Sequence, residues 1–217
     1  MKFKRGKNLR IIDKRSVFIS PNTIIGDNVT IYENNRIDGN CVIENGAIIL
    51  PGCYLRDTKV GAGAVINNSQ SENAVIGENC QVGPFARLRP GTILEKGVKI
   101  GNFVEVKNSI VGENTKIRHL AYVGDADVGK NCNVGCGAIF VNYNGKTKNR
   151  TVVGDGCFIG SNCNVIAPVE ISSRSYVCAG TTITDNVKTD DFVIGRVRQE
   201  IKENRAHKYL KEKKGEN

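Results

Sequence analysis

The 217-residue chain has 31 lysines and arginines against 22 aspartates and glutamates, a formal net charge of +9, and is 40% hydrophobic. This length allows one sizeable domain or two small ones, and the absence of tryptophan with only 6% aromatic residues predicts a core of small aliphatic side chains. No apolar run approaches the roughly 20 residues of a membrane span, and the first residues lack the apolar segment of a signal peptide. We therefore expect a cytoplasmic protein without a membrane partner.

The positive charge lies at the two ends of the chain. Residues 1–10 contain five cations and no acid, residues 196–217 contain eight cations and four acids, and residues 11–195 are neutral overall. Basic ends on a neutral body are usually solvated tails, and no nucleic-acid-binding module is recognisable. We expect a basic N-terminal segment over 1–15, a body over 16–190, a C-terminal arm with a basic, helical tail over 191–217, and no nucleic-acid partner.

The body repeats with a period of six residues. Aliphatic residues recur at steps of six from Ile25 to Leu55, resume after a five-residue step at Val60, and form a last unbroken series from Val153 to Ile183. Four residues after these positions the side chain is usually small or β-branched, and six of the eight cysteines stand there, where a free thiol acts as a small hydrophobe. Three residues after them, glycine or asparagine is frequent, and both tolerate the positive φ of a tight corner.

A period of six with a corner in each unit fits neither an α-helix nor a half-buried hairpin strand. It predicts an all-β fold, a parallel β-helix in which each hexad forms one short side of a coil, with about three hexads per coil. Residues about 18 apart would then lie above one another at the strand spacing of roughly 4.8 Å. These repeats resemble the left-handed β-helix of the hexapeptide acyltransferases, and the handedness follows from that resemblance because periodicity alone does not fix it.

Two interruptions of the repeat predict loops. The step from Ile66 to Ile76 is ten residues, and the step from Phe140 to Val153 is thirteen. An insertion in a solenoid leaves the coil as a loop, and loops on regular scaffolds often have a function. The first insertion is equally well explained as a surface excursion. The second, over 141–152, contains side chains suited to a ligand: Asn142, Tyr143 and Lys148.

The corner preference for glycine or asparagine fails between residues 85 and 126, which indicates a second constraint on that region. The exceptions are Phe85, Phe103, Ser109, Leu120 and Ala126. Within the same region, Arg89 and Lys107 each follow a core aliphatic residue and are 18 apart, so they should stack on one face. Two like charges so close need an anion or a carboxylate between them. A structural ion pair and a phosphate site both satisfy that need, and we favour the phosphate site.

His119 lies at the corner that leads to the same face, where Tyr122, Asn142 and Tyr143 also gather. A lone histidine is more often structural than catalytic, but a histidine that titrates near neutral pH beside cations suits a general base. Glu105 lies fourteen residues earlier, close to one coil back, and should orient the imidazole through Nδ1.

Seven long strings of this sequence are similar to one family. They are GPFARLRPG (83–91), IGNFVEVKNS (100–109), HLAYVGDADVG (119–129), NVGCGAIFVNYNGKTKNRTVVGD (133–155), FIGSNCNVIAPV (158–169), AGTTIT (179–184) and IGRVRQ (194–199). From about residue 9 to 200 the chain resembles the C-terminal half of the bacterial bifunctional N-acetylglucosamine-1-phosphate uridylyltransferase/glucosamine-1-phosphate acetyltransferases. The resemblance implies acetyl transfer from acetyl-CoA to the amine of glucosamine-1-phosphate, for UDP-N-acetylglucosamine and cell-wall synthesis, by a homotrimer with sites between its copies.

The same resemblance implies roles for individual residues. His119 would be the general base, assisted by Glu105, and neither a metal nor a cysteine nucleophile is needed. The sugar phosphate would be held by Arg89, Lys107, Tyr122, Asn133 and Lys148. The acetyl-CoA site would be lined by Cys136, Asn142, Tyr143, Ser161, Ala179 and Arg196. The family usually has alanine at the position of Cys136, and its N-terminal nucleotidyltransferase domain has no counterpart in this sequence, so we expect uridylyl transfer to be absent.

Three other functions are alternatives for such a fold. An acyltransferase for another amino-sugar phosphate would keep the fold and the base, and a non-catalytic β-helix scaffold would bind no acetyl-CoA. A zinc carbonic anhydrase on this fold needs three histidine ligands, whereas the chain has two histidines, one of them His207 in the tail.

Overall fold

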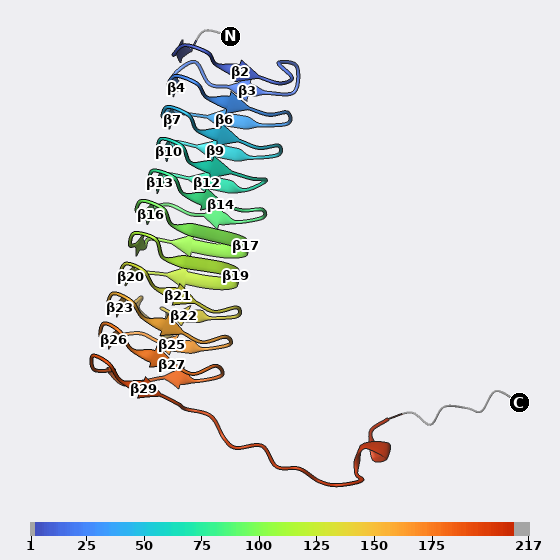
Figure 1. Cartoon of the computed structure of the whole chain (residues 1–217), viewed down its shortest axis with the longest axis vertical. Helices are drawn as coiled ribbons and strands as arrows, with labels where there is room; N and C mark the ends of the chain where they lie inside the picture. The colour runs from blue at the N-terminus through green and yellow to red at the C-terminus, as the bar shows by residue number, and fades with distance from the viewer. Residues whose placement is uncertain (1–2, 211–217) are drawn as a thin grey trace, which may run out of the picture.

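The computed structural model describes residues 3–210 and shows a parallel β-solenoid shaped as a slender triangular prism (Figure 1). Short strands follow one another around each coil, and every strand pairs in parallel with the strands above and below it. The predicted all-β parallel β-helix is therefore confirmed, and the arrangement is consistent with left-handed coils.

The strands stack on three faces of the prism. The first face consists of β1 (Lys4–Arg5), β4 (Ile24–Ile25), β7 (Val42–Ile43), β10 (Lys59–Val60), β13 (Val75–Ile76), β16 (Ile93–Leu94), β18 (Ile110–Val111), β20 (Ala126–Val128), β23 (Thr151–Val153) and β26 (Val169–Ile171). The second face consists of β2 (Arg10–Ile11), β5 (Thr30–Ile31), β8 (Ile48–Ile49), β11 (Val65–Ile66), β14 (Gln81–Val82), β21 (Asn133–Val134), β24 (Phe158–Ile159), β27 (Tyr176–Val177) and β29 (Phe192–Val193). The third face consists of β3 (Phe18–Ile19), β6 (Arg36–Asp38), β9 (Tyr54–Arg56), β12 (Gln70–Glu72), β15 (Arg87–Leu88), β22 (Ile139–Val141), β25 (Asn164–Ile166) and β28 (Thr182–Ile183). The long strands β17 (Lys99–Lys107) and β19 (Lys116–Gly124) continue from the second face onto the third.

The core is the axis of the prism. The aliphatic residues of the six-residue repeat are buried along it, and Phe140 is the largest fully buried side chain. The six cysteines at the small-residue positions are buried free thiols, as the repeat predicts: Cys41, Cys53, Cys80, Cys132, Cys157 and Cys163.

The corners contain residues with positive φ, as expected. Where the repeat shortens to five residues, the corner moves one residue earlier, to Asn108 (φ 45°) and Asp125 (φ 51°). Ser109 and Ala126 are therefore not corner residues, and their interpretation as exceptions is wrong. Both are buried. Asparagine and aspartate are among the few residues that adopt a left-handed conformation readily, which explains their use in the shortened corners.

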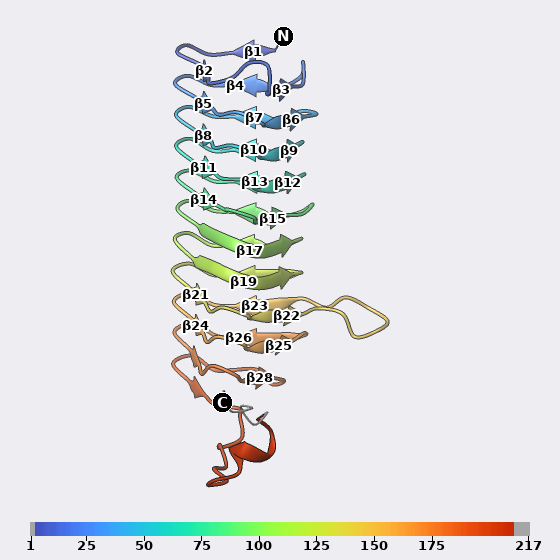
Figure 2. The ribbon, with the colours of Figure 1, turned by 90° about the vertical axis from the view of Figure 1, so that its right-hand side faces the viewer.

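The loop predicted between Ile66 and Ile76 does not exist. This segment contains β12, and Ser71 occupies a core position in register with Leu55 and Leu88. The buried Ser71 hydroxyl is satisfied by a 3.0 Å hydrogen bond with the Thr58 hydroxyl. Two successive five-residue steps were hidden because a serine replaced the aliphatic residue between them. The second predicted loop is confirmed, since the chain leaves the prism between β22 and β23 (Figure 2).

The solenoid extends beyond the predicted body at both ends. β1 and β2 pair with β4 and β5, so the segment before residue 16 already contributes to the first coil. β29 pairs with β27, and the chain then leaves the prism as an arm (Figure 1). The described part of the arm contains only the 3-10 turn η1 (Ala206–Lys208), so the predicted helical tail is not seen there, and residues 211–217 lie outside the described residues. Within residues 3–210, no helix is long and apolar enough to cross a membrane.

Candidate functional site

The third face and its two corners contain most of the predicted site residues. The β17–β19 register pairs Asn102 with His119, Glu105 with Tyr122, and Lys107 with Gly124. His119 thus lies at one end of the face and Lys107 at the other. Four residues of β19 lie between these two positions, and the chain turns a corner at the first of them, Leu120.

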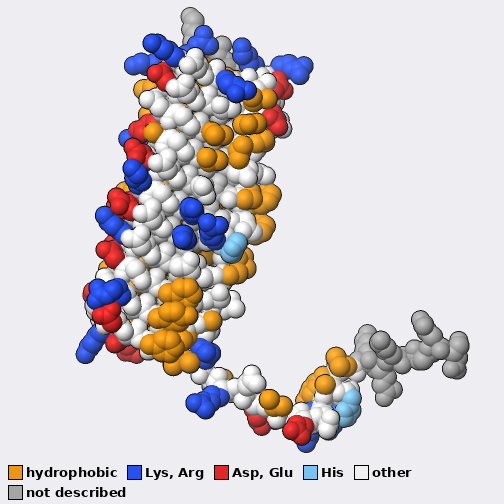
Figure 3. Space-filling view, in the orientation of Figure 1, with side chains coloured by type: hydrophobic (Ala, Val, Ile, Leu, Met, Phe, Trp, Pro, Cys, Tyr) orange, Lys and Arg blue, Asp and Glu red, His pale blue; other side chains and the backbone are white. Residues whose placement is uncertain are grey.

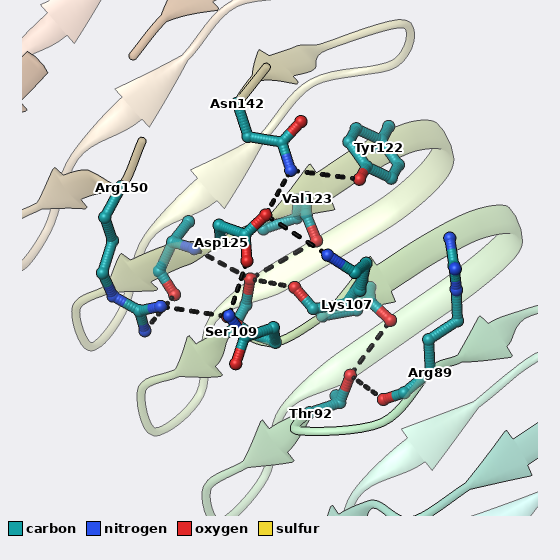
Figure 4. Close-up of polar contacts among 12 residues, drawn as sticks. Arg89, Thr92, Lys107, Ser109, Tyr122, Val123, Asp125, Asn142 and Arg150 are labelled. Atoms are coloured by element: carbon teal, nitrogen blue, oxygen red, sulfur yellow. Dashed lines mark hydrogen bonds and ion pairs between the residues drawn. The ribbon is translucent and has the colours of Figure 1, made fainter. Parts of the chain in front are cut away.

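Three cations converge at the far end of the face. The Arg89 N–H donates to the Val106 carbonyl at 2.8 Å, which places Arg89 directly beside Lys107, as the 18-residue spacing predicted (Figure 4). Lys148 reaches the same place from the loop, where the neighbouring ammonium of Lys107 lowers the pKa of Lys148. The charge of Arg89 lowers the pKa of Lys148 as well, so all three cations are close enough to act on one another.

Two carboxylates lie among these cations. Arg89 Nη1 donates to Glu105 Oε1 at 2.9 Å, and the Lys107 ammonium is 3.4 Å from Asp125 Oδ2. The sequence left an ion pair and a phosphate site as alternatives, and the structure shows ion pairs at both cations. Three cations against two carboxylates still leave one positive charge in excess, so the cluster attracts an anion.

Asp125 is a site residue that the sequence did not single out. It is 6% exposed, and its carboxylate accepts hydrogen bonds from Asn108 Nδ2 at 2.5 Å and from Asn142 Nδ2 (Figure 4). The same Asn142 amide donates to the Tyr122 hydroxyl at 3.3 Å. Asn142, which was expected to line the acetyl-CoA site, is 8% exposed and links Asp125 to Tyr122 through these hydrogen bonds. The sequence feature that could have pointed to Asp125 is an acidic residue at a corner where the repeat shortens to five residues.

The Asp125 network predicts a loss of stability in acid. Burial raises the pKa of Asp125, but hydrogen bonds from Asn108 and Asn142 and the charge of Lys107 outweigh it and hold the pKa below the usual value of an aspartate. A depressed pKa stabilises the folded state above the unfolded-state value, and that contribution is lost as the pH falls through the folded-state value.

The free energy of unfolding should therefore fall as the pH drops below about 4. Urea unfolding from neutral pH down to about pH 3 measures this dependence. Asp127 also has a lowered pKa, through Arg150, so the informative quantity is the difference between the natural protein and Asp125→Asn. The free energy of unfolding of the variant should depend less on pH in acid. Parallel plots of this free energy against pH for the two proteins would show that Asp125 does not contribute to the acid dependence.

His119 does not contact Glu105, contrary to the prediction. Its Nδ1 lies 3.0 Å from Asn102 Oδ1, whereas Glu105 lies opposite Tyr122 and binds Arg89. One coil back from His119 is 17 residues, because the step from Val106 to Val111 is five. That shorter coil brings Asn102 into register with His119.

The corner beside His119 is strained and apolar. Phe85, Phe103 and Leu120 have φ of 58°, 58° and 40°, and more than half of each side chain is exposed. Bulky residues in this region cost about 1–3 kcal/mol each and persist where the surrounding structure imposes them. The Phe85 and Phe103 rings stack at 5.6 Å, and apolar side chains run along the edge of the prism beside its histidine (Figure 3). Strain with exposed apolar surface indicates an interface or a ligand at this edge.

Four residues expected at the acetyl-CoA site lie together on this edge. Hydrogen bonds from Asn162 N–H to the Cys136 carbonyl and from Gly180 N–H to the Ser161 carbonyl, each 2.8 Å, place Cys136, Ser161 and Ala179 in consecutive coils after His119. Arg196 Nη1 donates to the Ala179 carbonyl at 3.1 Å.

Two predicted residues lie elsewhere. Asn133 is on β21 of the second face, in register with Lys116 and Phe158, and the structure does not bring it to the cations. Tyr143 is exposed on the loop, where its hydroxyl donates to the Gly145 carbonyl at 2.7 Å. Among residues 3–210, no group of three or more histidine, cysteine, aspartate or glutamate side chains is arranged to hold a metal ion.

The chain matches the family described as "GMPPB C-terminal domain" over residues 13–96 and 70–143, and "Bacterial transferase hexapeptide (six repeats)" over 150–185. "Bifunctional protein GlmU" of Caldicellulosiruptor saccharolyticus is 50% identical over 197 residues, which are 91% of this chain and 42% of that protein. The chain belongs to the family described as "GMPPB C-terminal domain". The GlmU of Shouchella clausii is 42% identical over 93% of this chain and 44% of its own length. The chain thus spans less than half the length of these GlmU relatives.

A solved structure shares the fold of this GlmU-related chain. Arabidopsis UDP-N-acetylglucosamine acyltransferase matches with a TM-score of 0.50 and 15% identity, covering 87% of this chain and 66% of that one. At this identity the likeness concerns the fold alone.

Proposed function

We propose that the chain transfers the acetyl group of acetyl-CoA to the 2-amine of glucosamine-1-phosphate, giving N-acetylglucosamine-1-phosphate for UDP-N-acetylglucosamine synthesis. The observation that carries the proposal is one face with His119 at one end and a cluster of excess positive charge at the other. The amine and the phosphate are carried by adjacent carbons of this substrate and are therefore close together. When the amine is at His119, at least one cation must extend toward His119 to contact the phosphate. Lys148 is suited to this contact because its long side chain is exposed and lies on the loop between β22 and β23.

In the proposed reaction His119 Nε2 takes a proton from the amine as the amine nitrogen attacks the thioester carbonyl. General-base catalysis of this kind typically contributes a factor of about 10²–10⁴. A backbone N–H near Cys136 and the Ser161 hydroxyl stabilise the oxyanion, and the intermediate then expels the CoA thiolate. Glu105, bound to Arg89, holds the guanidinium toward the phosphate and does not contact the base.

Lys148→Met should raise the KM for glucosamine-1-phosphate by about tenfold, the factor expected for one charged hydrogen bond. Lys148 has no carboxylate within ion-pair distance among the described residues, so its removal strands no buried acid. The KM for acetyl-CoA should not change. Lys146→Met on the same loop is the matched control, and equal effects of the two substitutions would contradict the specific role of Lys148.

The activity itself is tested by thiol release from acetyl-CoA with a panel of acceptors. Glucosamine-1-phosphate should be the fastest acceptor, and glucosamine without its phosphate should be much slower. A different amino-sugar phosphate as the best acceptor would keep the chemistry and change the substrate. No thiol release with any acceptor, together with no binding of acetyl-CoA by calorimetry, would leave a non-catalytic scaffold.

We further propose a cytoplasmic homotrimer. The exposed ridge of Phe85, Phe103 and Leu120 supplies an apolar surface for a second copy next to His119, and the arm that leaves the prism can reach a neighbour. All eight cysteines are free thiols, which suits a reducing compartment.

A further inference from the structure

We infer that Asn102 positions the imidazole of His119 and selects its tautomer. The Asn102 Oδ1 oxygen lies 3.0 Å from His119 Nδ1, and the two residues are direct register partners on β17 and β19. An amide oxygen can only accept, so the neutral imidazole carries its hydrogen on Nδ1. Nε2 then has the free lone pair. The inference rests on the proposed function in that this lone pair is the base for the amine.

The backbone around both residues is shaped to hold this pair. A Cβ on Gly101 would lie 1.8 Å from the Arg118 carbonyl oxygen, so only glycine lets the two coils approach this closely just before Asn102 and His119. Phe103 and Leu120, the residues that follow, both have positive φ. The two strained corners therefore stack, and they turn Asn102 and His119 outward at the same edge.

Glu105 cannot serve in place of Asn102 in this arrangement. Its carboxylate accepts from Arg89 at 2.9 Å, and its register partner is Tyr122, three residues along β19 from His119. A neutral amide also differs chemically from a carboxylate, because it fixes the tautomer without adding a negative charge beside the imidazole. Asn102 is therefore a positioning residue, acting on the reaction only through His119.

Imidazole ¹⁵N NMR of the full chain tests this directly. The chain has two histidines, so a His207→Gln variant leaves the signals of His119 alone. At a pH where the ring is neutral, we expect a protonated Nδ1 and an unprotonated Nε2. In Asn102→Ala the balance should move toward protonated Nε2, and kcat for acetyl transfer should fall about tenfold with little change in KM. Asn102→Asp keeps an acceptor oxygen and should keep the Nδ1–H form.

Two further variants complete the test. Glu105→Gln should leave the His119 tautomer unchanged, and Asn40→Ala, an exposed asparagine in an early coil, is the matched control. A natural protein with protonated Nε2, or an Asn102→Ala variant with the natural ¹⁵N pattern, would overturn the inference. The NMR result does not depend on turnover. If Asn102→Ala shifts the tautomer but the natural protein acetylates no acceptor, Asn102 still orients His119 and the proposed function is refuted.

Discussion

Replacing His119 with alanine should lower kcat about 10²–10⁴-fold, the contribution of a general base, while the protein stays folded. His119 is exposed, and among residues 3–210 its side chain makes one hydrogen bond, to Asn102, at the edge of the prism. The coil beneath it is held by backbone pairing along β17 and β19 and by buried aliphatic side chains. Loss of the imidazole therefore removes chemistry and almost no packing.

Thiol release under saturating acetyl-CoA and acceptor measures the change in kcat, and thermal unfolding checks the fold. His207→Ala, in the exposed arm, is the matched control and should retain full activity. A His119→Ala variant with more than about a tenth of the natural kcat would remove His119 as the base, because a general base contributes more than that.

Phe140→Ala should destabilise the protein by about 3–5 kcal/mol, the usual cost of removing a buried phenylalanine. Phe140 is fully buried, and among residues 3–210 it is the only aromatic residue in the core. It lies on β22, where its register partner on β25 is Val165, and the chain leaves the prism for the loop immediately after this strand. A cavity at this point weakens both neighbouring coils, since each coil of a solenoid is stabilised mainly by the next.

Urea unfolding gives the stability difference, and the less disruptive Phe140→Leu should cost under about 1.5 kcal/mol. The loop that starts beyond β22 carries Asn142 and Lys148, so Phe140→Ala should also raise the KM for the sugar phosphate. A cost below about 1 kcal/mol would mean that the coil collapses around the missing ring and that Phe140 does not determine the local packing.

The fold could be predicted because each six-residue unit of the aliphatic repeat forms one side of a coil. Glycine and asparagine at positive φ marked the corners, and small cysteines marked the narrow part of the core. At Ser71 the prediction from the aliphatic repeat is wrong. A serine at a core position, with its hydroxyl satisfied by Thr58, looked like the middle of an insertion. The pattern of residue types could not reveal that a polar residue had taken an apolar position.

The candidate site could be predicted in part, since distances around a coil depend on its length. Eighteen residues correctly stacked Arg89 beside Lys107. Glu105 was misplaced because fourteen residues were taken as close to one coil, whereas the coil before His119 has seventeen residues and brings Asn102 to it. Asp125 was missed because a corner aspartate is also a common structural choice. Its role becomes visible only with the contacts from Lys107, Asn108 and Asn142.

A crystal structure of the protein with glucosamine-1-phosphate and CoA would test most directly whether one face holds both the base and the anion. We expect the sugar amine within hydrogen-bond distance of His119 Nε2, and phosphate oxygens bound by Arg89, Lys107 or Lys148. A sugar phosphate bound on another face, or bound with its amine remote from His119, would show that this face is not the active site.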